Sequence, residues 1–324
     1  MRVAEFNQYG GAERLQLSEH SEPATCSGQV KLRVMATGLN DFDWGMMRGK
    51  PYVLRIGAFK KPKYSVLGCD VAGEVAELGP GVTEWSVGDR VAVDLSDQNW
   101  GGFGEYTIAK ADSLARIPDD MSFVEAATLP HSGVLALQAV RQIGGFRKGK
   151  HILINGAGGG SGHILIKMAV QAGMKVTAVD TTSKLNYLRK CGAEEVIDYT
   201  KENYFDRKDM FDLIIDLQGH GKAASYYSCL KKGGRMSLVG GASSTIIGVL
   251  FIGGLMSLFS SKKLLVLGHK PNASDIAQLM DLYSNGVYSP VVDSVYPLEE
   301  IQSAFEHYRM GQPKGKVVID LSDK

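Results

Sequence analysis

Residues 151–162, HILINGAGGGSG, decide the fold of this 324-residue chain. HILIN predicts a buried strand, and the glycine-rich turn after it leads into the helical pattern of SGHILIKMAVQAG. Ala157, Gly159 and Gly162 follow the GxGxxG spacing, with alanine in the first position. A strand, a glycine turn and a helix in this order let the backbone approach a pyrophosphate at the helix N-terminus. The residues expected to hold a dinucleotide here are Gly156, Ala157, Gly159, Gly160 and Gly162.

The alternative is a glycine-rich turn without a ligand, and an acid at the expected distance argues against it. Asp180 ends the next strand, VTAVD, where a carboxylate would accept hydrogen bonds from the adenosine ribose of NAD. Lys184 follows four residues later, and its ammonium could instead bind the 2′-phosphate of NADP or form a surface ion pair with Asp180. The two residues therefore leave NAD and NADP open.

The rest of the chain predicts two domains around this turn. Up to about residue 121, short apolar runs alternate with glycine and proline turns, as in VKLRVMATGL, VAGEVAEL, DRVAVDL and GEYTIA, which is typical of a β-barrel. From 122 to 269, strand patterns (HILINGAG, KVTAVD, EEVID, DLIIDL, RMSLVG, KLLVLGH) alternate with helical ones, including a single helix over SFVEAATLPHSGVLALQAVRQI. This alternation predicts an α/β fold with a doubly wound parallel sheet. Residues 270–324 predict two helices and a strand that return to the first domain.

Composition restricts the partners and the compartment. The 36 Lys and Arg balance 35 Asp and Glu, and no basic stripe is present, so we expect no nucleic-acid partner. The cysteines lie far apart without a CxxC pair, which suggests neither a disulfide framework nor a clustered zinc site. The N-terminus lacks a secretory pattern, and we expect a cytoplasmic protein.

One long apolar run needs its own interpretation. No charged residue occurs between Arg235 and Lys262, and the stretch SSTIIGVLFIGGLMSLFSS is long enough to consider a membrane span. The uncharged run after Arg235 opens with the strand pattern MSLVGG, which leaves too few residues for a full spanning helix. We expect a buried loop and helix at the active site and no membrane association.

Several motifs together resemble the quinone oxidoreductase branch of the medium-chain dehydrogenase/reductase superfamily. They are NDFDW from Asn40, VLGCDVAGEVAELGPGVTEWSVGDRVA, GGFGEYTIA, AATLPHSGVLALQ, the glycine turn, CGAEEVIDYT and YPLEEIQSAFEHYRMGQPKGKVVI. The resemblance spans the whole chain. It implies a GroES-like β-barrel domain with a Rossmann domain inserted between its two sequence segments, and a homodimer joined through the sheet edge at KLLVLGH.

The resemblance also implies that zinc is absent. Alcohol dehydrogenase relatives hold a catalytic zinc with a Cys, a His and a second Cys, whereas Asn40 and Cys69 stand here at the first two of these positions. The four-cysteine structural zinc lobe has no counterpart between Val93 and Tyr106. A lone thiol is a poor tetrahedral site. Without a Lewis acid, reduction of an already electrophilic conjugated system is the easier chemistry.

The same resemblance suggests the residues around the reacting groups. Asn40 and Asp43 are expected to line the cleft near the nicotinamide, although Asp43 could equally stabilise a turn. Tyr52 resembles a tyrosine that relatives present to the acceptor, where a phenol could stabilise an oxyanion or relay a proton, and its alternative is a packed aromatic.

Further positions concern the cofactor. Tyr199 and Lys184 match positions beside the adenine or its 2′-phosphate, while Leu135 replaces a threonine that relatives place near the nicotinamide ribose. Gly240 and Gly241 fit a close backbone approach to the nicotinamide amide, or a simple strand-ending turn. His131 and His269 lack metal-like partners in the sequence and are interpreted as structural.

The sequence therefore predicts a reductase that uses NADP or NAD, without zinc, to transfer a hydride to a small quinone or α,β-unsaturated carbonyl. Two alternatives stay open. One is a low-turnover NAD(P)H-binding interaction protein, which Leu135 and the apolar segment 246–259 would favour. The other is an NAD(P)-dependent alcohol dehydrogenase, which requires zinc ligands that the sequence does not reveal.

Overall fold

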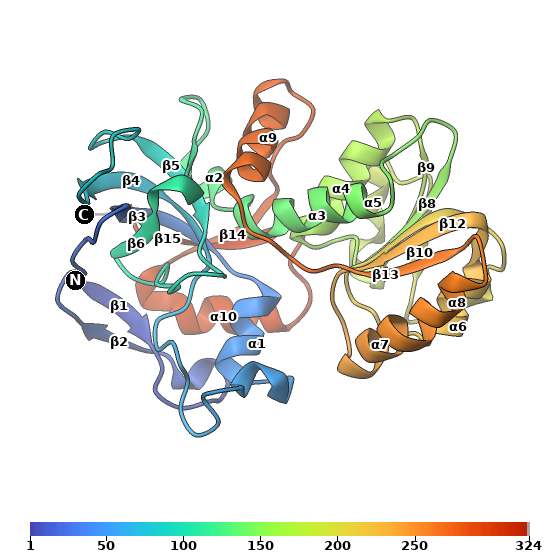
Figure 1. Cartoon of the computed structure of the whole chain (residues 1–324), viewed down its shortest axis with the longest axis horizontal. Coiled ribbons are helices and arrows are strands. Elements are labelled where there is room, and N and C mark those ends of the chain that lie inside the picture. The colour runs from blue at the N-terminus through green and yellow to red at the C-terminus, as the bar shows by residue number, and fades with distance from the viewer. Residues whose placement is uncertain (323–324) are drawn as a thin grey trace. The chain divides into compact units, whose positions relative to one another are not determined.

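The computed structural model describes residues 1–322, and the chain divides into two compact units (Figure 1). Unit 1 comprises Met1–Val134 and the chain from Lys270 onward, and unit 2 comprises Leu135–His269. The second division coincides with the predicted end of the inserted domain at residue 269. The first division falls after Val134 instead of after residue 121, because residues 122–134 pack on unit 1. Arg90 lies over the ring of Phe123, and a side chain at Gly133 would meet Leu279.

Unit 1 is the predicted β-rich, GroES-like domain. Its seven-stranded sheet has the order β14-β15-β3-β4-β5-β7, with β6 paired to β3, and β1 and β2 form a separate hairpin. The sequence alternation of β3 produces alternating burial, so that Val30, Leu32 and Val34 enter the core of the sheet. The strands are β1 (Arg2–Glu5), β2 (Gln16–Glu19), β3 (Gln29–Gly38), β4 (Asp70–Leu78), β5 (Arg90–Asp94), β6 (Tyr106–Lys110), β7 (Ala115–Arg116), β14 (Val292–Pro297) and β15 (Lys316–Asp320).

Short helices cover and connect the strands of unit 1. Phe305 of α10 packs edge-on against Phe103, with ring centroids 5.7 Å apart, and thereby anchors this helix in a second hydrophobic core. The helical segments are η1 (Ala12–Arg14), α1 (Asp41–Arg48), η2 (Tyr52–Arg55), η3 (Ala111–Ser113), α2 (Phe123–Ala126), α9 (Ala273–Ser284), η7 (Leu298–Glu300) and α10 (Ile301–Arg309).

The single helix predicted over residues 122–143 was wrong. The structure has two helices, α2 and α3 (Pro130–Gln142), with a break between them. Pro130 is the first residue of α3, where its missing N–H costs no hydrogen bond and its fixed φ suits a helix start. His131 therefore lies in the first turn of α3 and not in the middle of a long helix.

Unit 2 is the predicted doubly wound parallel sheet. All six strand patterns form strands, in the order β10-β9-β8-β11-β12-β13, and every neighbouring pair is parallel. The strands are β8 (His151–Asn155), β9 (Lys175–Asp180), β10 (Glu195–Asp198), β11 (Phe211–Asp216), β12 (Leu230–Leu238) and β13 (Lys263–Val266). Helices α4 (Gly160–Gln171) and α5 (Leu185–Cys191) cover one face of the sheet, and α6 (Ala223–Cys229) covers the other (Figure 1). The short turns η4 (Thr182–Lys184) and η5 (Tyr204–Asp206) also belong to this unit.

The apolar run near residue 250 is helical, but the prediction that it is buried was wrong. It forms α7 (Ser243–Gly248), a π-helical turn η6 (Val249–Gly253) and α8 (Gly254–Leu258). Val249 packs beneath it, whereas seven large apolar side chains are more than half exposed on its outer face. They are Ile247, Leu250, Phe251, Ile252, Leu255, Leu258 and Phe259, and we call them the apolar face. Among residues 1–322, no helix has the length and apolarity needed to cross a membrane.

Candidate functional site

The glycine turn of unit 2 has the geometry of a phosphate-binding turn. Gly156 adopts φ +76°, a left-handed conformation that suits glycine, and α4 begins at Gly160. A Cβ on Gly162 would lie 2.5 Å from the Cα of Ala157, so only glycine allows α4 to approach the turn this closely. The turn therefore presents the N-terminus of α4 without any side chain at its closest contact.

Asp180 and Lys184 lie directly beside this turn. The backbone N–H of Gly158 donates to Asp180 Oδ2 at 2.8 Å, and Lys184 Nζ lies 3.8 Å from Asp180 Oδ1. Both side chains are largely buried, and a Cβ on Gly158 would meet the Lys184 chain at 2.5 Å. The carboxylate and the ammonium thus occupy the same end of the turn.

The remaining predicted cofactor residues lie at the carboxyl ends of the parallel strands. Tyr199 follows β10 with an exposed side chain, and its N–H donates to the carbonyl of Asp180 at 3.2 Å. Asp198 accepts hydrogen bonds from Thr182 and Thr200, which lower its pKa to about 2 and fix the loop carrying Lys184. Gly240 and Gly241 follow β12, and the N–H of Gly219 donates to the Gly240 carbonyl at 3.0 Å. The structure therefore gathers all the predicted cofactor residues along one edge of the sheet.

A second cluster of polar residues is buried in unit 1 around Asn40. The Asn40 amide donates to Asp70 Oδ2 at 2.9 Å and to the carbonyl of Gly38 at 3.2 Å. Its oxygen accepts from Lys316 Nζ at 2.7 Å and from Ser132 Oγ at 3.3 Å. Because both ends of the amide are bonded, its orientation is fixed by the protein interior.

Asp43 belongs to the same cluster and stabilises the start of α1. Its carboxylate accepts from the backbone N–H of Asn40 at 2.8 Å and of Gly68 at 3.1 Å, so the turn-stabilising role considered for it is confirmed. Burial, reinforced by the charge of Asp70, raises the pKa of Asp43 to about 7 against the opposing charge of Lys316. The carboxyl of Asp43 therefore keeps its proton to a higher pH than an exposed aspartate does.

Lys316 and Asp70, which sequence reasoning did not single out, provide the buried charges of the cluster. Lys316 Nζ lies 2.7 Å from Asp70 Oδ2, and both side chains are almost fully buried. The pairing of β15 with β3 sets Val318 opposite Gly38, which brings Lys316 next to Asn40. The signal available in the sequence was a lysine within an otherwise apolar strand, KVVI, where a charge requires a buried partner.

The prediction that His131 lacks metal-like partners was wrong. Its ring lies with Cys69 and Asp94, and one ligand atom from each lies within 4.8 Å of the others. Among residues 1–322 this is the one group of at least three such side chains gathered as closely. His269 does not belong to this group.

Two of these three side chains are hydrogen-bonded to each other in this structure. His131 Nδ1 lies 2.9 Å from Asp94 Oδ2, which is a hydrogen-bond distance, whereas two nitrogen or oxygen ligands on zinc lie about 3.3 Å apart. Burial and the charges of Asp43, Asp94 and Asp70 raise the pKa of the Cys69 thiol well above its usual value. The geometry is that of a histidine–aspartate pair.

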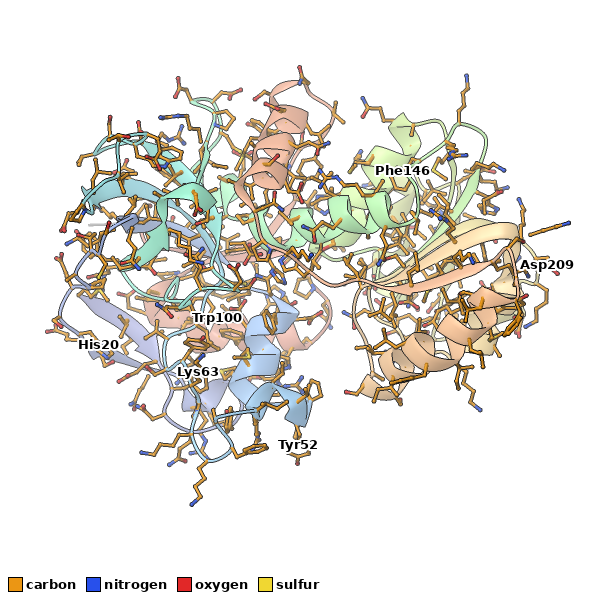
Figure 2. The ribbon with its side chains drawn as sticks, in the orientation of Figure 1. His20, Tyr52, Lys63, Trp100, Phe146 and Asp209 are labelled. Atoms are coloured by element: carbon orange, nitrogen blue, oxygen red, sulfur yellow. The ribbon has the colours of Figure 1, made fainter. Side chains whose placement is uncertain are left out.

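A row of aromatic rings leads away from this pair. Phe42 stacks on His131 with centroids 5.9 Å apart, Trp100 lies 5.0 Å from Phe42, and Tyr64 lies 6.3 Å from Trp100 (Trp100 is labelled in Figure 2). Trp100 holds this place with φ +61°, a conformation that costs a non-glycine residue about 1 kcal/mol or more. Tyr64 also lines a hollow of about 180 Å³ together with Phe6, Tyr9 and Met46.

Tyr52 is not brought together with Asn40 and Asp43. It begins the 3₁₀ turn η2, its side chain is 67% exposed, and Arg55 lies over its ring at 5.2 Å (Figure 2). Tyr52 is therefore not a packed core aromatic either. Its predicted contact with the acceptor stays a prediction.

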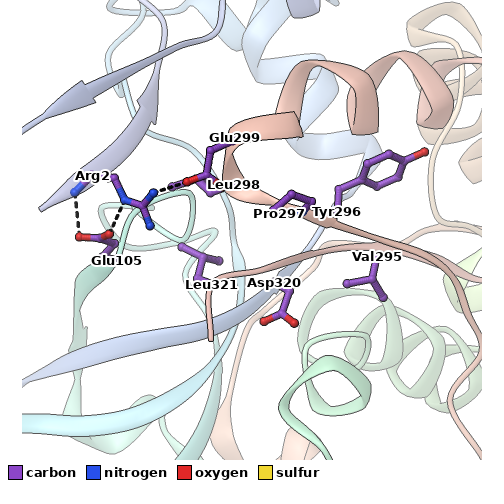
Figure 3. Close-up of a pocket in the computed structure, with 9 residues that line it drawn as sticks. All are labelled: Arg2, Glu105, Val295, Tyr296, Pro297, Leu298, Glu299, Asp320 and Leu321. Carbon is purple, nitrogen blue, oxygen red and sulfur yellow. Dashed lines mark hydrogen bonds and ion pairs between the residues drawn. The ribbon is translucent and has the colours of Figure 1, made fainter. Parts of the chain in front are cut away.

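A larger hollow of about 330 Å³ lies elsewhere in unit 1 and contains none of the predicted site residues (Figure 3). Its charged side chains already pair with one another: Arg2 Nε bonds Glu105 at 2.7 Å, and Arg2 also contacts Glu299. Asp320 also lines the hollow, so three carboxylates face one guanidinium and the lining carries a net negative charge.

Comparison with known proteins agrees with both units. A family model described as "Alcohol dehydrogenase GroES-like domain" matches residues 26–119, and one described as "Zinc-binding dehydrogenase" matches residues 191–319. The 2-methylene-furan-3-one reductase of Solanum lycopersicum is 31% identical, over 98% of this chain and 79% of the relative. The structure of the Coxiella burnetii quinone oxidoreductase has a TM-score of 0.89 at 27% identity, with 99% of each chain covered. The Escherichia coli quinone oxidoreductase complexed with NADPH has a TM-score of 0.85 at 25% identity, covering 99% of this chain and 100% of that one.

The GroES-like unit, the doubly wound unit and the glycine turn define an NAD(P)-binding oxidoreductase. The chain belongs to the quinone oxidoreductase branch of the medium-chain dehydrogenase/reductase superfamily.

Proposed function

We propose that the protein is a zinc-independent reductase that uses NADPH or NADH to reduce a quinone or an α,β-unsaturated carbonyl. The observation that carries the proposal is the polar cluster of unit 1, where Lys316 provides the buried positive charge and His131 pairs with Asp94. Phe42, which stacks on His131 and is only partly buried, offers an aromatic surface suited to a planar conjugated acceptor. The names of the relatives, an enone reductase and two quinone oxidoreductases, agree with this acceptor class.

The glycine turn of unit 2 fits the cofactor. Gly156 to Gly162 would hold the pyrophosphate at the N-terminus of α4, and Asp180, Lys184 and Tyr199 would contact the adenosine end. Gly240 and Gly241 would lie against the nicotinamide amide. When bound, the cofactor supplies the hydride, and the protein's own groups orient the acceptor and supply the proton.

The test is oxidation of NADPH and of NADH by the purified protein, followed at the nicotinamide absorbance, with a panel of quinones, enones and enals. We expect acceptor-dependent turnover that survives dialysis against a chelator, together with substoichiometric zinc by metal analysis. The ratio of kcat/KM for the two cofactors then reports whether Asp180 or Lys184 dominates.

Each other outcome favours a different reading. Stoichiometric zinc whose removal abolishes turnover would contradict the zinc-independent proposal and favour an alcohol dehydrogenase. Tight cofactor binding without turnover on any acceptor would favour the interaction protein.

We also propose a cytoplasmic location, in keeping with four cysteines that are all free thiols.

We further propose a homodimer joined at β13. This strand ends the order of the parallel sheet, and the apolar face lies on the helices packed beside it. An exposed strand edge next to exposed apolar side chains is a surface that a second copy would cover. We expect twice the chain mass in sedimentation equilibrium, and the monomer mass for the Phe251→Asp/Leu255→Asp variant. The control Val295→Asp, at an exposed apolar residue of unit 1, should stay dimeric. A monomeric wild type would contradict this assembly.

A further inference from the structure

His131 and Asp94 form a buried pair whose geometry is fixed from both sides. Asp94 is the last residue of β5, and its Oδ2 lies 2.9 Å from His131 Nδ1. The backbone N–H of His131, in the first turn of α3, donates to Asp70. The imidazole is therefore held by an anion at Nδ1, and its second ring nitrogen, Nε2, lies on the side of the ring away from that bond.

The charges around this pair favour the protonated imidazole. Burial opposes the charge, but the carboxylates of Asp94 and Asp70 outweigh burial and the repulsion of Lys316, and they raise the pKa of His131 above its usual value. The other ionisable groups in the cluster are Asp43 and the thiol of Cys69. An imidazolium can donate a proton, which is what the reduction of a conjugated carbonyl requires after the hydride has arrived.

Aromatic rings pack next to the pair. Phe42 lies nearly parallel to the His131 ring, at an interplanar angle of 19°, and Trp100 and Tyr64 continue the row. Trp100 is buried in the core, so the part of the row that an acceptor can contact next to the imidazole is Phe42, which is only partly buried. His307, by comparison, pairs with Asp293 at 3.5 Å and contacts the ring of Tyr296, with centroids 6.1 Å apart.

We propose that His131 is the proton donor of the reductase and that Asp94 is its positioning residue. This inference rests on the proposed function. The nicotinamide hydride adds to the β-carbon of the acceptor, and the two electrons of the C=C bond move onto the α-carbon and carbonyl oxygen as an enolate. The Nε2–H bond of His131 then breaks, and its proton goes to the α-carbon. The products are the saturated carbonyl and the oxidised cofactor, and His131 regains a proton from solvent.

The main alternative is that the pair only anchors α3 to β5. A buried hydrogen-bonded pair can serve this purpose alone, and both roles predict some loss of stability on mutation. They differ in the pH dependence of turnover, because an anchor does not exchange a proton with the acceptor.

The test compares His131→Asn with wild type and with the matched control His307→Asn. Asparagine keeps a side chain able to bond Asp94 but cannot titrate near neutral pH. We expect kcat for an enone to fall by about 100-fold or more in His131→Asn, with the Kd for NADPH unchanged and partial rescue by added imidazole. The control His307→Asn should keep the wild-type kcat.

The pH profile gives a second readout. Wild-type kcat should be constant where His131 is protonated and should fall as pH rises through its raised pKa, whereas His131→Asn should lose this fall. Asp94→Asn removes the main charge that raises this pKa, so its fall should begin at lower pH. Wild-type turnover in D₂O should also be slower than in H₂O.

The outcomes separate this inference from the proposed function. If wild type reduces the enone and His131→Asn matches it in kcat and pH profile, the proton-donor role is overturned while the reductase stands. If wild type reduces no acceptor, the proposed function itself fails. Should neither variant fold, a wild-type kcat that is independent of pH and shows no solvent isotope effect would still overturn the inference.

Discussion

Replacing Lys316 with methionine is expected to lower the free energy of unfolding by about 3–5 kcal/mol. The substitution keeps a long apolar side chain but removes the ammonium that lies 2.7 Å from both Asp70 and Asn40. Asp70 would then be a buried carboxylate without its ion pair, and burial of an unpaired charge is costly. The measurement is urea unfolding followed by fluorescence or circular dichroism.

Two further variants show whether removal of the Lys316 charge causes the loss of stability. Lys314→Met, at an exposed position two residues away, should leave the unfolding free energy nearly unchanged. Lys316→Met combined with Asp70→Asn should recover part of the loss, because the unpaired charge is removed together with its partner. An unchanged stability for Lys316→Met alone would contradict the buried ion pair.

Replacing Gly162 with alanine is expected to weaken NADPH binding by about 100-fold, equivalent to about 2.7 kcal/mol. The added Cβ would lie 2.5 Å from the Cα and carbonyl oxygen of Ala157, so the turn or the start of α4 must shift. A shifted turn no longer aims the N-terminus of the helix at the pyrophosphate. Quenching of protein fluorescence by NADPH measures the Kd.

The matched control is Gly254→Ala in α8, where an added Cβ meets no atom within 4 Å. This variant should bind NADPH like wild type and be as stable or more so, since alanine favours helix. If Gly162→Ala bound NADPH with wild-type affinity while folded, the turn could not be the phosphate site.

The parallel sheet could be predicted from the sequence because its strands are buried on both faces. Five of the six strands are four to six residues long, such as HILIN and FDLIID, and β12 has nine. The cofactor residues could then be predicted as well, because the carboxyl ends of parallel strands lie along one edge of the sheet. Local pattern was enough for this half of the molecule.

The polar cluster of unit 1 could not be predicted in the same way. Asp70 and Lys316 are 246 residues apart, and only the register of β15 on β3 brings them together. His131 was misjudged for the same reason, because its partner Asp94 ends a strand that sequence reasoning did not connect to α3. Long-range strand pairing carries no local signature.

The apolar face was misjudged for a different reason. Composition shows that residues 246–259 are apolar, but a helix buried in its own chain and one covered by a second copy share this composition. Phe251 is 74% exposed and Phe259 is 84% exposed, so the chain's own core does not cover them.

The most direct test of the proposed hydride transfer uses NADPH deuterated at C4 of the nicotinamide, with each stereoisomer tried in turn. The acceptor is an enone, and the product is analysed by mass spectrometry and NMR. We predict that one of the two isomers places a single deuterium on the β-carbon of the saturated ketone, in chelator-treated protein as well as in untreated protein. A product that carries no deuterium from either isomer, or the absence of any reduced product, would contradict the account.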